Sequence, residues 1–380
     1  MCNYKEIIND NIETLIKLEL KNEVLRTPCL FDKSHYMYFN KEKKTFICLA
    51  CNFELELLDL LLDIQEDTEE LNIVSKIFKR LGLSLKDINK LKREQEIYNK
   101  LLYVINGEAA SFFKEQLYKN KDALNYLKKR NITDETIDKF QLGYAPKYNL
   151  LYRFLKNNFY EKNLEAAGLI QYHEKTKKYS DFFKDRITFS ILDNIDGQQE
   201  TLGFGGRILS KGKDPRKYIN TKTTPIFKKS DCLYSFNFIK DKPKQIIISE
   251  GYMDVIAQHQ AGIDYAVATL GTALTHNHYK ILKNKCDNLT AIFDGDTAGV
   301  KAAEKAITQI GKFNILILPK EMDPDDYINK YGIDDYLDFL NKKTVSFTDY
   351  LIDKFTNENK TQNKRQNIFK QLLKLPSINI

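Results

Sequence analysis

Tryptophan is absent from this 380-residue chain, and no run of apolar residues approaches the roughly 18 that a membrane-spanning helix requires. The first residues also lack the charged and apolar regions of a signal peptide. With 42% hydrophobic and 29% charged residues, the composition is typical of a globular protein with a substantial core. We therefore expect a cytoplasmic protein that does not associate with membranes.

Cysteine is scarce, at six residues. Six unevenly spaced cysteines are too few for a disulfide scaffold in a chain of this size, although Cys29, Cys48 and Cys51 form a cluster. The phosphate-binding sequence Gly-x4-Gly-Lys-Ser/Thr does not occur, which excludes a fused P-loop helicase.

Positive charge is concentrated in one segment. The net charge is +7, and residues 201–242 contain ten Lys or Arg against three Asp or Glu, so this segment accounts for all of it. Clustered positive charge attracts polyanions such as nucleic acid. A lysine-rich genome composition is the alternative explanation for part of this signal.

Acidic side chains follow three short apolar runs, at the point where each run ends. The runs are residues 245–249, 290–293 and 314–319; helices are expected after the first two, with Thr297 as the predicted N-cap of the second. Strands that alternate with helices predict a doubly wound parallel sheet, whose functional residues lie at the carboxyl ends of the strands. The acids are Glu250 and Asp254, then Asp294 and Asp296, then Asp323, Asp325 and Asp326.

Electrostatics indicates what such an acid cluster is for. Two carboxylates 4 Å apart repel by about 4 kcal/mol at an effective dielectric of about 20, so several facing one crevice require cations between them. Oxygen ligands without His or Cys suit Mg²⁺ or Mn²⁺, as in phosphoryl-transfer sites. The alternative is that each acid is a solvated turn residue. Three groups in register on successive strands favour the metal site.

A second candidate metal site lies near the N-terminus. Short strands are expected at residues 25–29 and 36–39, followed by a helix from Leu55 to Leu62. Two ligand pairs separated by a hairpin are typical of a zinc ribbon, although the first pair is irregular; reduced, partly buried thiols are the alternative. The candidate ligands are Cys29, Asp32 and His35 before the hairpin and Cys48 and Cys51 after it.

Three local features of the remaining chain carry predictions. Asp196-Gly197 predicts a hairpin turn. The glycines within residues 203–206 interrupt an apolar strand, which predicts close approach of another strand or of a phosphate backbone. His276 and His278 stand beside lysines, which predicts an exposed helix start and not a pair of ligands.

Four motifs in the acidic region resemble the Toprim domain of bacterial DnaG-type primases. They are Glu250-Gly-Tyr-Met-Asp254, Leu270-Gly-Thr-Ala-Leu-Thr275, Asp294-Gly-Asp296-x-Ala-Gly299 and Asp323-Pro-Asp325. The helical stretch from Ala123, which ends in a Leu-Gly-Tyr-Ala-Pro turn at Pro146, resembles the start of the primase catalytic core.

The resemblance implies a multidomain α/β protein. Its expected parts are a zinc-ribbon-like DNA-binding domain with a helical linker, an α+β basic subdomain that begins the catalytic core, a doubly wound Toprim domain with a parallel sheet, and C-terminal helices. Their boundaries are residues 1–100, 101–242, 243–326 and 327–380.

The same resemblance implies a DNA-dependent RNA polymerase that makes short RNA primers on single-stranded DNA from ribonucleoside triphosphates, at the replication fork. Glu250, Asp294, Asp296 and Asp254 are the implied catalytic residues. The first three are expected to bind one Mg²⁺ or Mn²⁺, and Asp254 with Asp323 and Asp325 a second ion or its waters. The implied nucleotide or template contacts are Arg186, Arg207, Lys217, Tyr218 and Lys229.

The zinc domain of these primases has Cys-Pro-Phe-His before its hairpin, and Asp32 stands where the family has the histidine. Either Asp32 or His35 completes a Zn²⁺ site with the three clustered cysteines, or the ion has been lost. The family also carries a further C-terminal domain that engages the replicative helicase. Nothing of that length follows Ile380, so we expect either a fragment or a helicase link of another kind.

Two other functions stay open on the sequence. A Toprim nuclease or topoisomerase would share the acids but cut nucleic acid, and a topoisomerase would add an attacking tyrosine, for which 22 tyrosines are available. A replication accessory that binds single-stranded DNA without catalysis is the non-enzymatic alternative. The basic segment and the core motif favour primase.

Overall fold

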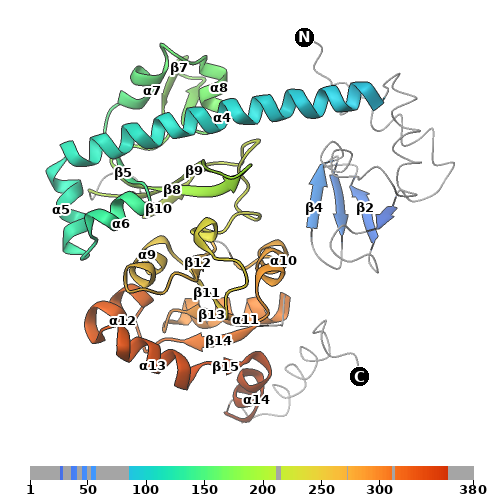
Figure 1. Cartoon of the computed structure of the whole chain (residues 1–380), viewed down its shortest axis with the longest axis vertical. Coiled ribbons are helices and arrows are strands. Elements are labelled where there is room, and N and C mark those ends of the chain that lie inside the picture. The colour runs from blue at the N-terminus through green and yellow to red at the C-terminus, as the bar shows by residue number, and fades with distance from the viewer. Residues whose placement is uncertain are drawn as a thin grey trace. The chain divides into compact units, whose positions relative to one another are not determined.

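The computed structural model divides into two compact units, Met1–Tyr98 and Asn99–Ile380 (Figure 1). Each is described by itself. No helix in the described ranges is long and apolar enough to cross a membrane. The residues that the structure describes are 26–28, 36–40, 45–48, 53–56, 85–210, 215–271, 273–309 and 313–357.

The first unit contains a four-stranded antiparallel sheet in the order β1-β2-β3-β4. The strands are β1 (Arg26–Pro28), β2 (Tyr36–Asn40), β3 (Thr45–Cys48) and β4 (Phe53–Glu56). Both predicted strands are confirmed. The helix predicted from Leu55 is wrong at its start, because Leu55 pairs with Phe46 of β3 as part of a strand. Cys29, Asp32, His35, Cys51 and the side chain of Cys48 lie outside the described residues.

Helices open the second unit. The long helix α4 (Leu85–Lys119) begins before the division between the units and is followed by α5 (Lys121–Lys129) and α6 (Asp134–Lys139). Thr133 caps α6 by accepting a hydrogen bond from the Thr136 amide. Two shorter helices, α7 (Leu150–Leu155) and α8 (Glu161–Ala166), stand beside the hairpin of β6 (Ile170–His173) and β7 (Lys178–Asp181).

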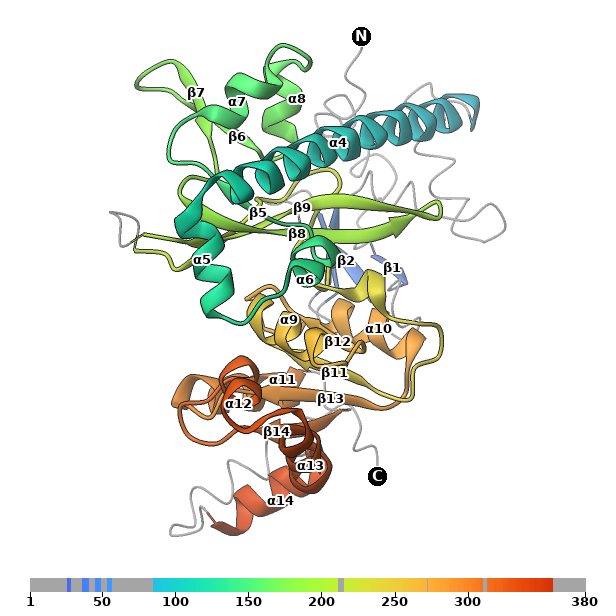
Figure 2. The same ribbon diagram turned by 60° about the vertical axis from the view of Figure 1, so that its left-hand side comes forward.

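An antiparallel sheet in the order β10-β9-β8-β5 forms the middle of this unit (Figure 2). Its strands are β5 (Leu142–Ala145), β8 (Arg186–Ile195), β9 (Gln198–Ile208) and β10 (Tyr218–Asn220). The hairpin turn is confirmed, with positive φ at Asp196 and Gly197. The Leu-Gly-Tyr-Ala sequence predicted as a turn is instead strand β5, because it pairs along its length with β8.

A five-stranded sheet in the order β12-β11-β13-β14-β15 carries the acidic motifs. The three predicted strands are confirmed as parallel neighbours: β11 (Ile246–Ser249), β13 (Leu289–Phe293) and β14 (Asn314–Ile317). The short strands β12 (Ala266–Ala268), which is parallel, and β15 (Val345–Ser346), which is antiparallel, were not predicted. The accompanying helices are α9 (Tyr252–Gln260), α10 (His276–Lys285), α11 (Thr297–Gln309), α12 (Pro324–Tyr331), α13 (Ile333–Lys343) and α14 (Phe347–Asn357), with a 3₁₀ turn at Phe236–Phe238.

Tyr252 joins the four-stranded and the five-stranded sheets of the second unit. Its ring stacks on Phe189 of β8 at 4.8 Å between centroids, and its hydroxyl donates a hydrogen bond to Asn220 at 2.5 Å. A Cβ on Gly205 of β9 would lie 2.3 Å from the Tyr252 ring, so only glycine fits there. The predicted close approach at the strand glycines is therefore confirmed, and the Tyr252 ring makes it at Gly205 while the Thr221 side chain makes it at Gly203.

Candidate metal and nucleotide site

The acidic residues gather at the carboxyl ends of three neighbouring parallel strands. Glu250 follows β11, Asp294 and Asp296 follow β13, and Asp323 opens α12 after β14. Their charges act on one another: burial raises the pKa of Asp294 most, and the charges of Glu250 and Asp323 raise it further. Oxygens of Asp323, Asp325 and Asp326 lie within 4.8 Å of one another. The structure thus brings together acids that are more than 70 residues apart in the sequence.

Two glycines allow close backbone packing in the loop that follows β13. A Cβ on Gly295 would lie 2.0 Å from the Pro319 carbonyl oxygen, and the Gly295 amide donates to the Met322 carbonyl at 3.3 Å. A Cβ on Gly299 would lie 2.3 Å from the Asp294 carbonyl oxygen. Gly295 therefore lets the loop after β13 pack directly against the loop after β14, whereas Gly299 lets the start of α11 pack against the backbone of Asp294.

The cap of α11 differs from the prediction. The helix begins at Thr297, so its cap is the preceding residue, and Asp296 Oδ1 accepts a hydrogen bond from the Gly299 amide at 2.7 Å. The predicted cap, Thr297, is wrong by one position. Because a capping carboxylate is held at the helix N-terminus, the orientation of Asp296 is fixed.

Glu250 and Asp254 are held in different ways. Asp254 is buried, and its Oδ2 accepts a hydrogen bond from the Gly251 amide at 2.9 Å. Burial raises its pKa well above the usual range, and the charges of Asp323 and Asp294 add to the effect. Glu250 Oε1 is also buried, yet it has no hydrogen-bond partner among the described residues. Burial, and then the charge of Asp296, raises the pKa of Glu250.

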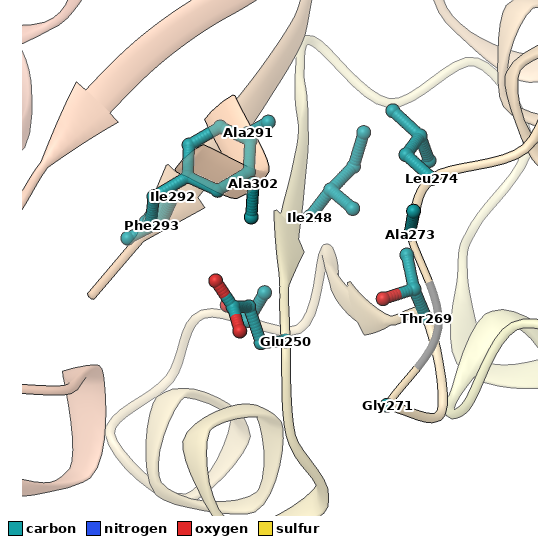
Figure 3. Close-up of a pocket in the computed structure, with 11 residues that line it drawn as sticks. Ile248, Glu250, Thr269, Gly271, Ala273, Leu274, Ala291, Ile292, Phe293 and Ala302 are labelled. Atoms are coloured by element: carbon teal, nitrogen blue, oxygen red, sulfur yellow. The ribbon is translucent and has the colours of Figure 1, made fainter. Parts of the chain in front are cut away.

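Glu250 stands beside a pocket of about 320 Å³ (Figure 3). The pocket is mainly apolar, with Ile248, Phe293 and Leu274 among its lining residues, and Thr269 contributes a hydroxyl. An ionised carboxylate in such surroundings is costly without a counter-charge. Keeping Asp294 ionised is costly for the same reason, since burial and then the charge of Glu250 raise its pKa to about 7.

Asp325 is paired within the protein. Its Oδ2 accepts a hydrogen bond from Arg130 Nη1 of the basic subdomain at 2.5 Å, and its Oδ1 accepts from Asn329 Nδ2 at 2.7 Å. Asp323 instead caps α12, accepting from the Asp326 amide at 2.7 Å. Arg130 belongs to the helical motif but was not predicted as a site residue. Its partner is 195 residues away in the sequence, so no local pattern marks it.

Positive and aromatic side chains lie beside the acids. Arg207 lies over the ring of Tyr126 at 4.5 Å and over that of Tyr218 at 5.9 Å, and Lys217 lies over Tyr218 at 5.9 Å. The positive charges of Arg130 and Lys217 act on Asp323 to lower its pKa, against the larger effect of burial, which raises it. Nucleotide contacts predicted at Arg207, Lys217 and Tyr218 are therefore next to the acid cluster.

Arg186 has a different environment from the other predicted contacts. It is 2% exposed, and its guanidinium donates to the backbone carbonyls of Gly206, Arg216 and Lys217 at 3.0–3.4 Å. Its donors thus tie β8 to β9 and to the segment that precedes β10, which argues for a structural role. Lys229 is half-buried, and burial lowers the pKa of its ammonium group.

The donor set of the acid cluster fits a hard divalent cation. All the candidate ligands are carboxylate oxygens, Glu250 Oε1 is buried without a partner, and the pKa of Asp294 is raised to about 7 by burial and neighbouring charge. A cation would offset both costs. The side chains that would hold it are those of Glu250, Asp294 and Asp296, with Asp323 and Asp326 adjacent.

A parallel sheet with a glutamate after one strand and Asp-x-Asp pairs after the next two defines a protein of the Toprim class. Residues 247–328 match the family described as Toprim-like, and residues 112–240 match the N-terminal domain of the DNA primase catalytic core. The DNA primase of Aquifex aeolicus is 31% identical over 351 residues, covering 90% of this chain and 68% of that protein. The chain belongs to the bacterial DnaG-type DNA primase family.

Solved structures agree with this assignment. A DnaG primase catalytic domain bound to single-stranded DNA matches at a TM-score of 0.63 with 28% identity, over 74% of this chain and 95% of that one. The zinc-binding and RNA polymerase domains of the Aquifex aeolicus primase match at 0.64 with 27% identity, over 99% and 94%. The chain spans 62%, 56% and 59% of the lengths of three other curated DNA primases that it matches.

Proposed function

We propose that the protein is a DNA primase, a DNA-directed RNA polymerase that makes short RNA primers on single-stranded DNA at the cytoplasmic replication fork. The observation that carries the proposal is the convergence of Glu250, Asp294 and Asp296 on one sheet edge, with carboxyl groups whose burial calls for a cation. Membership of the primase family supports the choice of polymerisation over strand cleavage.

The acids divide into two groups by position. Glu250, Asp294 and Asp296 would hold one Mg²⁺ or Mn²⁺, and Asp323, with Asp254 and Asp325 behind it, a second ion or its waters. Bound ions would neutralise the negative charge that develops on the leaving pyrophosphate and activate the attacking hydroxyl. The protein itself fixes three of these carboxylates, those of Asp254, Asp296 and Asp323, through hydrogen bonds at the N-termini of α9, α11 and α12, so their positioning precedes substrate binding.

The basic residues next to the acids would receive the substrates. Arg207 and Lys217 would contact phosphates of the ribonucleoside triphosphate or of the template, and Tyr218 would pack beside them, as would Lys229 from the following segment. The matched catalytic domain bound to single-stranded DNA supports a single-stranded template. Arg186 would contribute by holding the strand that carries Arg207 and the segment before β10 that carries Lys217.

We also propose one Zn²⁺ in the N-terminal unit, held by Cys29, Cys48, Cys51 and either Asp32 or His35. The matched Aquifex structure includes a zinc-binding domain, and its match covers 99% of this chain. Elemental analysis of reduced, freshly purified protein should find about one zinc per chain. An undetectable content would refute the site, and substituting Asp32 and His35 separately by Ala identifies the fourth ligand.

The polymerase proposal is tested with a single-stranded template, ribonucleoside triphosphates and Mg²⁺. The wild type and Glu174→Gln should make short RNA products, because Glu174 is an exposed residue of the β6–β7 hairpin. Glu250→Gln, which is nearly the same size but loses the charge, should make none. Nicked template without RNA would instead identify a Toprim nuclease, and template binding alone would identify a non-catalytic accessory.

A further inference from the structure

Side chains at the start of α10 form hydrogen bonds with three consecutive residues, 229–231, of the basic segment 201–242. His278 Nε2 lies 2.9 Å from the Lys229 carbonyl oxygen, Thr275 Oγ1 donates to the Ser230 carbonyl at 2.9 Å, and Asn277 Nδ2 donates to the Asp231 carboxylate at 2.7 Å. Three side chains from one helix turn thus fix the path of residues 229–231. This arrangement joins the basic segment to the loop that leads into α10.

His278 is the buried member of this group. Its exposed fraction is 0%, so the helix start that we expected to be exposed is buried at this position. Nε2 faces a carbonyl and must carry the proton, whereas Nδ1 accepts from the Thr275 amide at 3.3 Å and must not. Both ring nitrogens are therefore satisfied only in one neutral tautomer, and burial lowers the His278 pKa accordingly. No nitrogen remains for a metal ion or for proton transfer.

Lys229 is the residue whose backbone this imidazole holds. Its side chain is half-buried, and in the described part of the chain its ammonium has no carboxylate within ion-pair distance. Burial lowers its pKa. A lysine that gives up part of its hydration without gaining an acidic partner is suited to bind an anion that arrives with the substrate.

We propose that His278 is a positioning residue, which holds Lys229 in place to receive the phosphates of the nucleotide. The inference rests on the proposed function, within which Lys229 is a substrate contact. The loop before α10 supplies Thr269 and Leu274 to the pocket beside Glu250. The neutral imidazole therefore connects a cationic contact for substrate to the wall of the acidic site, and it does so without touching substrate.

The variants for the test separate the two bonds of the ring. His278→Leu removes both hydrogen bonds and keeps an apolar side chain of similar bulk. His278→Gln places an amide N–H at about the distance of Nε2, so it can restore the bond to the Lys229 carbonyl. His278→Asn is one methylene shorter and cannot reach. His276→Gln is the matched control, because His276 lies on the same turn with its ring against Tyr279.

In primer synthesis on a single-stranded template, His278→Leu and His278→Asn should raise the KM for ribonucleoside triphosphates about five-fold, the effect of one hydrogen bond, with kcat nearly unchanged. His278→Gln should recover most of the wild-type KM, and His276→Gln should not differ from it. A uniform loss of kcat with unchanged KM, or no recovery in the glutamine variant, would overturn the proposal.

A double-mutant cycle with Lys229→Ala tests whether His278 acts through Lys229. If it does, His278→Leu should add little to the KM increase of Lys229→Ala, whereas additive effects would show that the two residues act independently and would overturn the inference. Calorimetric binding of GTP to the same variants keeps the two proposals distinguishable. A wild type that binds GTP but makes no RNA refutes primer synthesis, while non-additive losses of GTP affinity would still support the role of His278.

Discussion

The ion pair between Arg130 and Asp325 gives the most direct test of the charge balance in the site. It joins the C-terminal end of α5 to the first turn of α12, with Arg130 Nη1 2.5 Å from Asp325 Oδ2. The Arg130 side chain is 33% exposed and that of Asp325 only 2%. Arg130→Met retains the aliphatic part of the side chain and removes the charge, which leaves Asp325 among like charges.

The expected cost follows from burial and distance. Oxygens of Asp325, Asp323 and Asp326 lie within 4.8 Å of one another. Two unit charges at that separation repel by about 3.5 kcal/mol at an effective dielectric of about 20. Removing one partner of a buried ion pair typically costs roughly 3 to 5 kcal/mol, and the partial exposure of Arg130 places this pair near the lower limit. We expect Arg130→Met to lower the free energy of unfolding by about 3 kcal/mol without divalent ions.

Divalent cations should compensate for part of this loss, since a cation can take over the charge that Arg130 supplies. Urea unfolding of the wild type and Arg130→Met, each with EDTA and with excess MgCl₂, measures the cost of the substitution without divalent ions and the stabilisation that Mg²⁺ provides. The Mg²⁺-dependent stabilisation should be larger in the variant by about 1 kcal/mol or more. Arg153→Met, at an exposed position of α7, is the control.

Two results would refute this reasoning. If Arg130→Met unfolds at the same urea concentration as Arg153→Met in EDTA, the pair contributes nothing and Asp325 tolerates its surroundings without a cation. If Mg²⁺ stabilises the wild type and Arg130→Met equally, the guanidinium and the metal do not share the same carboxylates, and Asp325 lies outside the metal site.

Two further predictions concern packing and pH. Gly205→Ala should lower the free energy of unfolding by about 1 to 3 kcal/mol, because the new Cβ would meet the Tyr252 ring at 2.3 Å. Gly107→Ala, with nothing within 4 Å, should raise it by about 0.5 to 1 kcal/mol, and equal urea midpoints for the two variants would contradict this packing argument. Burial lowers the pKa of His259 to about 4. Its contribution to stability is therefore complete above the unfolded pKa of about 6.5 and is lost as pH falls towards 4. Between pH 7.5 and 5.0, the free energy of unfolding measured in urea should fall by about 2 kcal/mol more for the wild type than for His259→Gln. Equal decreases in the two proteins would exclude this role of His259.

The central sheet and its acids could be predicted because each signal is local. An apolar run followed by Glu or Asp identifies the end of a strand without knowledge of its neighbours, and parallel topology then places Glu250, Asp294 and Asp323 on one edge. The same reasoning missed β12 and β15, which are three and two residues long and have little pattern of their own. It also read β5 as a turn, since its strand character comes from pairing with β8.

What the sequence could not show depends on contacts between distant segments. Arg186 and Arg207 both stand in apolar strands, yet one is buried against carbonyls and the other lies over two tyrosine rings. His278 sits among lysines, a context typical of an exposed helix start, but its partner is a carbonyl 49 residues away. Nothing in the local pattern separates these cases, because each is decided by the element packed against it.

The candidate site combines acidic and positively charged side chains that come from different parts of the second unit. The parallel sheet supplies the acids. Arg130 at the end of α5 pairs with Asp325, and Arg130 together with Lys217, which directly precedes β10, supplies the positive charge that acts on Asp323. The Tyr252 ring against Gly205, with its hydroxyl on Asn220, fixes the distance between the four-stranded and the five-stranded sheets. Substrate phosphates bring negative charge towards acids that already repel one another. Correctly placed positive side chains are therefore needed as much as the carboxylates that would bind the metal. Disturbing the Tyr252 contact should therefore weaken nucleotide binding even with every carboxylate intact.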